Sequence, residues 1–222
     1  FDAAEADPDV RCLVLTGAGD QAFSAGADLK ALARGERAIV PGREHYGFAG
    51  IVRHPTSTPV IAAVNGAALG GGTELALSAD LVVAAEHATF GVPEVKRGLL
   101  AAAGGVFRLP EQLPRKVAMR LVLPGEPMSA AEALRWGLVN EVVPAADVVP
   151  TAMALAEVVA ANAPLAVQAS KRLAQGIADG DRPAESALWD RSGAEMGRLL
   201  ASADAAEGIW AFAEKRPPRW SA

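Results

Sequence analysis

The stretch Asn65-Gly66-Ala67-Ala68-Leu69-Gly70-Gly71-Gly72-Thr73-Glu74 combines a triple glycine with a glutamate, and a second glutamate follows in Gly91-Val92-Pro93-Glu94. Three consecutive glycines let a backbone approach a ligand closely and turn its N–H groups toward it. Two carboxyl groups delivered to one place can serve as general acid and general base. The pattern therefore predicts chemistry in which negative charge develops on a carbonyl oxygen while protons move nearby.

Composition sets the size of the core and the classes of partner. The chain has 222 residues, of which 51% are apolar, enough for one large or two small domains with a substantial core. Its net charge of −5 and pI of about 5.3 argue against nucleic acid or an anionic membrane as the main partner. A polyanionic small molecule needs only a local basic patch and stays compatible with this charge.

Cysteine and histidine usage predicts a protein of the cytoplasm without a metal site. Cys12 is the single cysteine, so there is no disulfide framework and no cysteine-based zinc site, and a reducing compartment fits best. The histidines lack the spacing of a metal motif: His45, His54 and His87. The apolar run 60–77 is interrupted by Asn65 and by glycines, so we do not expect it to span a membrane.

Apolar runs bounded by turn residues predict strands, and longer amphipathic stretches predict helices. Strands are expected at 10–16, 59–64, 81–84, 89–90 and 138–143. Helices are expected from Asp28 onward, over 46–54 and over 71–78, and Ser129–Glu132 forms a capping box for a short helix that stops at Gly137. Residues 34–43 contain Gly, Arg and Pro and are expected to form a mobile loop.

After Pro144 the pattern changes to helices alone. Four Ala- and Leu-rich segments with one charged face are expected to be helical: 147–161, 164–178, 183–200 and 202–214. Strands alternating with helices, followed by helices only, predict an α/β core over residues 1–144 and an all-helical region over 145–222. Such helices pack either on their own core or against another subunit, and the pattern leaves both open.

Two short motifs suggest other chemistries, and both match incompletely. Gly17–Ala22 nominally fits a dinucleotide fingerprint, but Phe23–Ala27 continues with a poor helical pattern, and no acidic residue ends a second strand. Phe23–Gly26 resembles a nucleophile elbow without its first glycine, and no histidine stands in the late position that a serine nucleophile requires. A turn at the end of a strand explains these segments more simply.

Two glycine segments each precede a predicted helix: Gly26-Ala27-Asp28 and Gly70-Gly71-Gly72. Their N–H groups point outward at the positive end of a helix dipole, with Asp28 as a helix cap. Taken alone, the first segment is equally a tight turn with a cap. Close strand–helix packing is the ordinary explanation of the second, but it needs one glycine rather than three. Because both follow strands of one sheet layer, we expect their N–H groups to converge on one oxygen as an oxyanion hole.

Glu74 and Glu94 each have an ordinary interpretation beside the catalytic one. Glu74 falls in the first turn of a helix, where the dipole favours a carboxylate, and Glu94 stands in a turn after Pro93. Yet Glu74 is surrounded by apolar residues, and a buried carboxylate costs several kcal/mol unless it is paired or protonated. The two together favour a buried acid/base pair whose pKa values are raised by burial.

Several segments resemble the enoyl-CoA hydratase (crotonase) family, in the family's order and over nearly the whole chain. Ala22–Lys30 is similar to its first oxyanion segment, Pro59–Leu75 to its second, and Ala88–Glu94 to the segment with the second catalytic glutamate. Ala131–Val139 and Phe212–Arg216 match later landmarks. The resemblance implies an α/β fold, a spiral of ββα units, with C-terminal helices that build a trimer or a dimer of trimers.

The resemblance also implies roles for individual residues. The N–H groups of Ala27 and Gly71 would hold the thioester oxygen of an acyl-CoA, and Glu74 and Glu94 would be the acid/base pair. Residues of the first segment would line coenzyme A: Ala25, Ala27, Asp28, Leu29 and Lys30. Near the other end of the chain, two residues would reach the adenine of coenzyme A bound to a neighbouring subunit: Phe212 and Lys215. Coenzyme A is part of the substrate, so no separate cofactor and no metal is expected.

The activity implied is the addition of water across the C2=C3 bond of a trans-2-enoyl-CoA thioester, which gives a 3-hydroxyacyl-CoA. The family's usual assignment gives water activation to the position of Glu74 and protonation at C2 to that of Glu94. Other reactions stay open: isomerisation, dehydration of a carnitinyl-CoA type of hydroxyacyl-CoA, hydrolysis, and acyl-CoA binding without catalysis.

Two features depart from the family. Where many hydratases have a proline-containing turn, this chain has Gly98-Leu99-Leu100-Ala101-Ala102-Ala103-Gly104-Gly105, which leaves the acyl preference open. The family's N-terminal strands and first helix would lie before Phe1, and residues 1–6 have the pattern of a helix tail rather than of a signal peptide. We therefore expect that upstream residues, and a basic contact to coenzyme A among them, are absent from this sequence.

Overall fold

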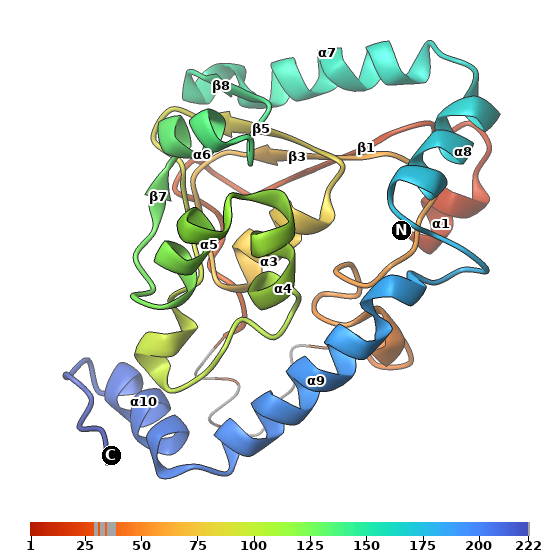
Figure 1. The fold of residues 1–222 in the computed structure, drawn as a ribbon. Coiled ribbons are helices and arrows are strands. Elements are labelled where there is room, and N and C mark those ends of the chain that lie inside the picture. The colour runs from red at the N-terminus through yellow and green to blue at the C-terminus, as the bar shows by residue number, and fades with distance from the viewer. Residues whose placement is uncertain (29–30, 32–33, 35–38, 222) are drawn as a thin grey trace.

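Two β-sheets form the centre of the computed structural model, which describes residues 1–28, 31, 34 and 39–221 (Figure 1). In spatial order, the first sheet contains β1 (Leu13–Thr16), β3 (Val60–Val64), β5 (Leu81–Ala85) and β8 (Glu141–Val143). All of its pairings are parallel. These strands are short apolar runs, as expected of a parallel sheet that is covered on both faces.

The second sheet contains β2 (Ala22–Ser24), β4 (Ala67–Leu69), β6 (Thr89–Gly91) and β7 (Met128–Ser129). The first three are parallel and β7 runs antiparallel to β6. The chain passes from a strand of the first sheet to one of the second and then into helical structure, as in β3, β4 and α3 (Gly71–Ser78). This confirms the predicted spiral of ββα units. Because β2 and β4 are parallel neighbours, the segments that follow them leave the sheet side by side.

Helices of the core follow β6. After η2 (Pro93–Arg97) the chain forms α4 (Gly105–Gln112), α5 (Arg115–Val122) and α6 (Ala130–Trp136). The capping box of Ser129 and Glu132 opens α6, and Gly137, with φ of 82°, ends it, as predicted. Other short helical elements lie elsewhere: α1 (Asp2–Ala6), η1 (Glu44–Tyr46) and η3 (Ala145–Asp147).

The helix expected over 46–54 is wrong. The structure has only η1 (Glu44–Tyr46) there, followed by hydrogen-bonded turns. Gly47 and Gly50 have φ of 70° and 69°, a left-handed conformation that interrupts an α-helix. The helix expected from Asp28 falls largely outside the described residues, as do residues 35–38 of the loop expected over 34–43.

Four C-terminal helices lie close to their predicted ranges: α7 (Val148–Ala160), α8 (Pro164–Ala174), α9 (Pro183–Leu200) and α10 (Ala203–Ala213). Helix α7 packs on β1, β3 and β5 through its buried residues Val148, Ala152 and Ala156. Helix α10 packs on η2, and α9 runs along the opposite side of the molecule from α7 (Figure 1). At least α7 and α10 therefore pack on their own core.

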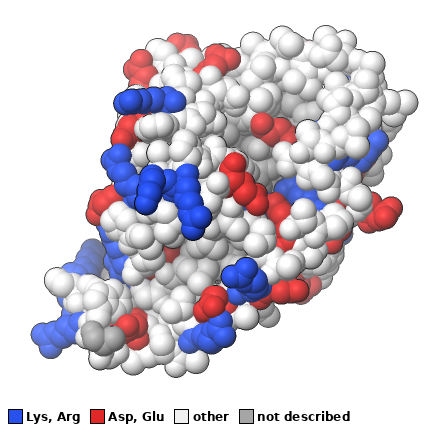
Figure 2. Space-filling model, viewed as in Figure 1, with Lys and Arg blue, Asp and Glu red and all other residues white. Residues whose placement is uncertain are grey.

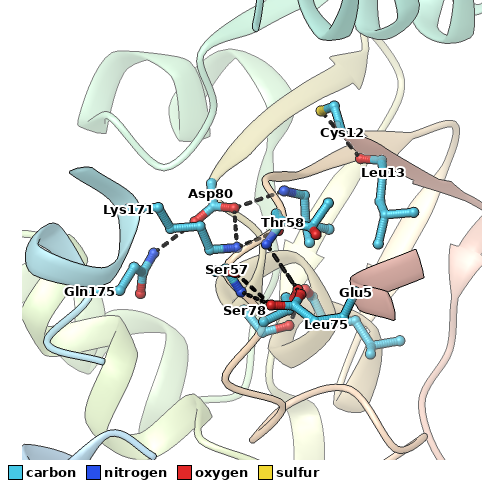
Figure 3. A network of polar contacts seen from close by, with 12 residues as sticks. Glu5, Cys12, Leu13, Ser57, Thr58, Leu75, Ser78, Asp80, Lys171 and Gln175 are labelled. Carbon is cyan, nitrogen blue, oxygen red and sulfur yellow. Dashed lines mark hydrogen bonds and ion pairs between the residues drawn. The ribbon is translucent and has the colours of Figure 1, made fainter. Parts of the chain in front are cut away.

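A polar network joins α8 to the first sheet (Figure 3). The Nζ of Lys171 donates to the Asp80 carboxylate at 2.7 Å and to the Thr58 carbonyl at 2.8 Å. Gln175 also donates to Asp80. On the other side of Thr58, Glu5 accepts hydrogen bonds that, against the effect of burial, lower the pKa of its carboxyl to about 2. The network fixes the entry to β3, which leads to the triple glycine.

Charged side chains of both signs are interspersed over the face shown in Figure 2. Within the described residues no group of three or more His, Cys, Asp or Glu side chains is arranged to hold a metal ion. No single described helix is long and apolar enough to cross a membrane, and only the stretch Ala145–Ala160 together with α8, bent by 108°, meets the length and hydropathy requirements.

Candidate active site

The two predicted oxyanion segments meet at Gly26 and Gly71. A Cβ atom on Gly26 would lie 2.7 Å from the Gly71 nitrogen, and one on Gly71 would lie 3.1 Å from the Gly26 Cα. Gly72 is tighter still, since a Cβ atom there would lie 1.9 Å from the Ser24 carbonyl oxygen. Close strand–helix packing therefore explains Gly72, and the convergence of two backbone segments explains Gly26 and Gly71.

Two N–H groups at this junction, those of Ala27 and Gly71, form no hydrogen bond with another described residue. The N–H of Gly26, in contrast, donates to the Ser24 hydroxyl. Gly71 is the first residue of α3, so its N–H is at the positive end of the helix dipole. The Asp28 carboxylate accepts from the Ala31 N–H at 3.2 Å, which is the predicted cap. The predicted coenzyme A contacts Leu29 and Lys30 lie outside the described residues.

The ring of Phe48 covers this junction, which the sequence did not predict. A Cβ atom on Gly71 would lie 2.6 Å from Cε1 of that ring. Phe48 lies between Gly47 and Gly50 in the turns after η1 and carries no local motif, so only the tertiary structure places it at Gly71.

Glu74 lies one turn into α3 and is 2% exposed. Its Oε1 accepts a hydrogen bond of 2.8 Å from the N–H of Gly105, the first residue of α4. Burial, and then the charge of Glu94, raise the pKa of Glu74 to about 8. Gly105 has no room for a side chain, because a Cβ atom would lie 3.0 Å from Glu74 Oε1 and 2.8 Å from the Ala101 Cβ.

Glu94 stands in η2, after Pro93, and its carboxyl group points toward the start of α3. Its Oε1 is 2.8 Å from the position of a Cβ atom on Gly70. Its Oε2 is buried and has no hydrogen-bond partner among the described residues. Burial raises the pKa of Glu94 to about 7. The charge of Glu94 therefore acts on Glu74, and Glu74 is buried while Glu94 is half-buried with one buried carboxyl oxygen.

Such a pair suits general acid/base chemistry near neutral pH. Carboxyls with pKa values of about 7 and about 8 exist as a mixture of one protonated and one ionised group in this range. A protonated carboxyl can donate a proton while its ionised neighbour accepts one. Because the pair lies beside the free N–H groups of Gly71 and Ala27, proton transfer and stabilisation of a negative oxygen are available at one place.

Phe212 and Lys215 do not join this cluster. Phe212, on α10, lies under the guanidinium of Arg97, whose Cζ is 4.8 Å from the ring centroid. Lys215 follows the end of α10 with φ of 55°. Helix α10 packs mainly on η2 and α9, so within one chain these two residues belong to a separate surface.

The competing motifs have structural roles. The turn Gly17–Asp20 is held by Asn65, whose side chain accepts from the Gly17 N–H and donates to the Gly17 and Gly19 carbonyls. A strand, β2, follows this turn where a dinucleotide fingerprint requires a helix. The Ser24 hydroxyl accepts from the Gly26 N–H, as part of the turn that leads into the oxyanion segment.

The raised pKa values predict that stability falls with pH. The folded chain binds protons at Glu74 and Glu94 more tightly than the unfolded chain, so the stability they contribute is complete below about pH 4.5 and is lost as pH rises through about 7 and 8. We expect Glu74→Gln to raise the free energy of unfolding at pH 9 by on the order of a few kcal/mol and to change it much less at pH 5. Urea denaturation at pH 5 and pH 9 measures the free energy of unfolding, with the exposed Glu157→Gln as the control variant. An equal change in that free energy at both pH values would contradict the prediction.

Comparison with known proteins adds the following. Residues 1–222 match the family model for enoyl-CoA hydratase/isomerase. A carnitinyl-CoA dehydratase of Salmonella typhi is 46% identical over 221 residues, which are 96% of this chain and 82% of that protein. A carnitinyl-CoA hydratase structure from Mycobacterium avium is 60% identical, with a TM-score of 0.97 over 99% of this chain and 84% of the other. An enoyl-CoA hydratase structure from Mycobacterium tuberculosis is 46% identical, with a TM-score of 0.73 over 99% and 84%.

Proposed function

Because the chain belongs to the enoyl-CoA hydratase/isomerase family, we propose that it is a hydro-lyase that acts on acyl-CoA thioesters. The reaction adds water across the C2=C3 bond of a trans-2-enoyl-CoA to give a 3-hydroxyacyl-CoA, or removes it in the reverse direction. One observation carries this proposal: the buried Glu74 and the half-buried Glu94 both have raised pKa values and both lie at the start of α3, beside the Gly26–Gly71 junction. An isomerase needs only one such acid, whereas hydration needs a proton removed from water and another delivered to carbon.

The backbone would stabilise the charge that develops during the reaction. The N–H groups of Ala27 and Gly71 would donate to the thioester oxygen, which draws electrons from C3 and stabilises the enolate-like intermediate. Loss of one such donor costs ~10²–10³ in rate. These donors sit on a backbone fixed by the contact of Gly26 with Gly71, so they need no rearrangement when charge appears.

The two glutamates would divide the proton transfers. Water held between them loses a proton to the ionised carboxylate of the pair, its oxygen bonds to C3, and C2 takes a proton from the protonated carboxyl. The C2=C3 π bond breaks as the new C3–O and C2–H bonds form. The proton taken from water then passes to the carboxyl that protonated C2, which restores the pair for the next cycle. Dehydration runs the same steps in reverse.

The relatives named as carnitinyl-CoA dehydratase or hydratase favour one particular substrate as a second candidate. Carnitinyl-CoA is a 3-hydroxyacyl thioester, so its dehydration is the reverse of the hydration described above. The same two glutamates and the same N–H groups would serve either substrate. The choice depends on the acyl end, where this chain has the small side chains of Ala101–Ala103 beside Gly105.

Binding and assembly complete the proposal. Coenzyme A would be lined by Ala25, Ala27, Asp28, Leu29 and Lys30, and reached from a neighbouring subunit by Phe212 and Lys215. The exposed leucines of α8, Leu165 at 78% and Leu173 at 84%, support assembly into a trimer or a dimer of trimers. With a single cysteine and an acidic surface, we place the protein in the cytoplasm, with no nucleic acid or membrane as a partner.

The proposal is tested by incubating the full chain with crotonyl-CoA, longer trans-2-enoyl-CoAs and carnitinyl-CoA, and following the absorbance of the enoyl thioester. We expect the absorbance to fall with the enoyl substrates, and to rise with carnitinyl-CoA if that is the preferred substrate. No change with any acyl group would exclude a hydro-lyase.

A further inference from the structure

Arg108 of α4 forms a buried ion pair with Glu185 of α9. Its Nε and Nη2 donate to the two oxygens of the Glu185 carboxylate at 3.0 Å and 2.7 Å, a bidentate arrangement. The Arg108 side chain is 3% exposed and that of Glu185 is 15% exposed. Glu185 also accepts from the indole N–H of Trp189, one turn further along α9, at 3.0 Å. The pair therefore joins a C-terminal helix to a helix of the core.

The core end of this pair is the turn that holds Glu74. Arg108 lies one turn after Gly105, whose N–H binds the Glu74 carboxylate. The N–H of Arg108 closes the first helical hydrogen bond of α4 onto the Gly104 carbonyl at 2.9 Å. A Cβ atom on Gly104 would lie 3.2 Å from the Trp189 ring and 3.3 Å from the Arg108 Cδ. Side chains from α9 thus fix the turn from which the Gly105 N–H is presented.

The charge of Arg108 also acts on Glu74. Burial and the charge of Glu94 raise the pKa of Glu74, and the charge of Arg108 lowers it. Arg182, which is buried just before α9, acts on Glu185 through its charge. Arg108, by contrast, is bound directly to the Glu185 carboxylate.

The remaining charges of the cluster lie further out. Arg182 interacts with Asp80 beyond it, and the guanidinium of Arg53 lies 4.9 Å from the Trp189 ring centroid. Nη1 of Arg108 and Nε of Arg182 are buried without a hydrogen-bond partner among the described residues. Glu185 is thus the group that compensates the charge of Arg108.

We propose that Glu185, acting through Arg108, is a positioning residue for the acid/base carboxyl of Glu74. The ion pair fixes the first turn of α4 and compensates the charge of Arg108, which acts on Glu74. The importance of this for catalysis rests on the proposed hydro-lyase function, but the effect on the carboxyl itself does not. In this way the C-terminal helical region, through α9, sets the protonation of a residue in the spiral core.

The test is a titration of Glu74 by carbon NMR in protein labelled at the glutamate carboxyl carbons, with the signal assigned by its loss in Glu74→Gln. Glu185→Gln leaves Arg108 uncompensated and is expected to lower the titration midpoint by about one pH unit. Arg108→Gln removes the cation and is expected to raise the midpoint by a similar amount. Glu195→Gln, which breaks an exposed pair with Arg198 on the same helix, is expected to leave it unchanged.

Opposite shifts separate this proposal from simple loosening of the structure. Loosening admits water to a buried carboxyl and lowers the midpoint in both variants, so a fall or no change with Arg108→Gln would overturn the proposal. If that variant does not fold, Arg108→Met combined with Glu185→Met removes both charges and keeps the volume. Its midpoint is expected above that of Glu185→Gln, and an equal or lower value would overturn the proposal. The titration needs no substrate, so its outcome is independent of whether the chain hydrates enoyl-CoA.

Discussion

Replacing Glu94 by Gln is expected to lower kcat for the hydration of crotonyl-CoA by roughly 10²–10⁴-fold, with little change in KM. The amide of glutamine has the shape of the carboxyl group, but it cannot transfer a proton at neutral pH. Glu94 is half-buried, with one buried carboxyl oxygen, and its pKa is raised by burial to about 7, so a neutral side chain at this position is compatible with the fold. The loss therefore reports proton transfer rather than folding.

Steady-state kinetics and calorimetric titration with coenzyme A measure the two parts of this prediction. Glu126→Gln is a matched control, since Glu126 pairs with Lys96 of the same η2 turn and is exposed. It is expected to leave kcat within about twofold of the wild type, in line with the small energies of surface ion pairs. If Glu94→Gln hydrates crotonyl-CoA as fast as the wild type does, Glu94 has no part in the chemistry.

Replacing Gly26 by Ala is expected to lower kcat/KM by roughly 10²–10³-fold, the effect of losing one oxyanion donor. The added Cβ atom would lie 2.7 Å from the Gly71 nitrogen and 3.2 Å from the Leu69 carbonyl oxygen, both backbone atoms. The two segments must then separate, and the N–H groups of Ala27 and Gly71 no longer converge on one point. Gly26 also has φ of 85°, so part of the effect is backbone strain.

Gly19→Ala separates strain from the site. Gly19 has φ of 76°, and a Cβ atom there would meet no atom within 4 Å. Both variants place an alanine in a left-handed conformation, so the midpoint temperature of thermal unfolding is expected to fall in both. Only Gly26→Ala is expected to lose activity. Full activity in Gly26→Ala would place the oxyanion-binding groups elsewhere.

The regular elements that could be predicted have local signals, whereas β2, β4, α4 and α5 were not predicted. The range of α3, the capping box of α6 and the extents of α7 to α10 follow from periodicity, glycines and caps within one segment. The failed helix over 46–54 had an acceptable pattern, but Gly47 and Gly50 adopt a left-handed conformation that helical periodicity does not reveal. Helix α8 ends at Ala174 rather than at 178, near Gly176 with φ of 63°.

The candidate site was predicted in part. Gly71 and Glu74 belong to one continuous segment, and Glu94 follows a short strand. The residue types and their order along the chain were therefore enough to predict these site residues. Arg108 and Glu185 stand 77 residues apart, and only the tertiary structure joins them. One signal for Arg108 did exist in the sequence. It lies between Phe107 and Leu109, in a short segment after two glycines where an apolar residue is the usual choice, so a charged residue there stands out.

The most direct measurement follows crotonyl-CoA in water enriched in ¹⁸O and deuterium, with the product examined by mass spectrometry. A hydro-lyase built on Glu74, Glu94 and the Gly26–Gly71 junction places one ¹⁸O at C3 and one deuterium at C2, and Glu94→Gln slows both incorporations together. A shifted double bond or deuterium exchange without ¹⁸O, or no labelled product at any enzyme concentration, would contradict the addition of water by this pair.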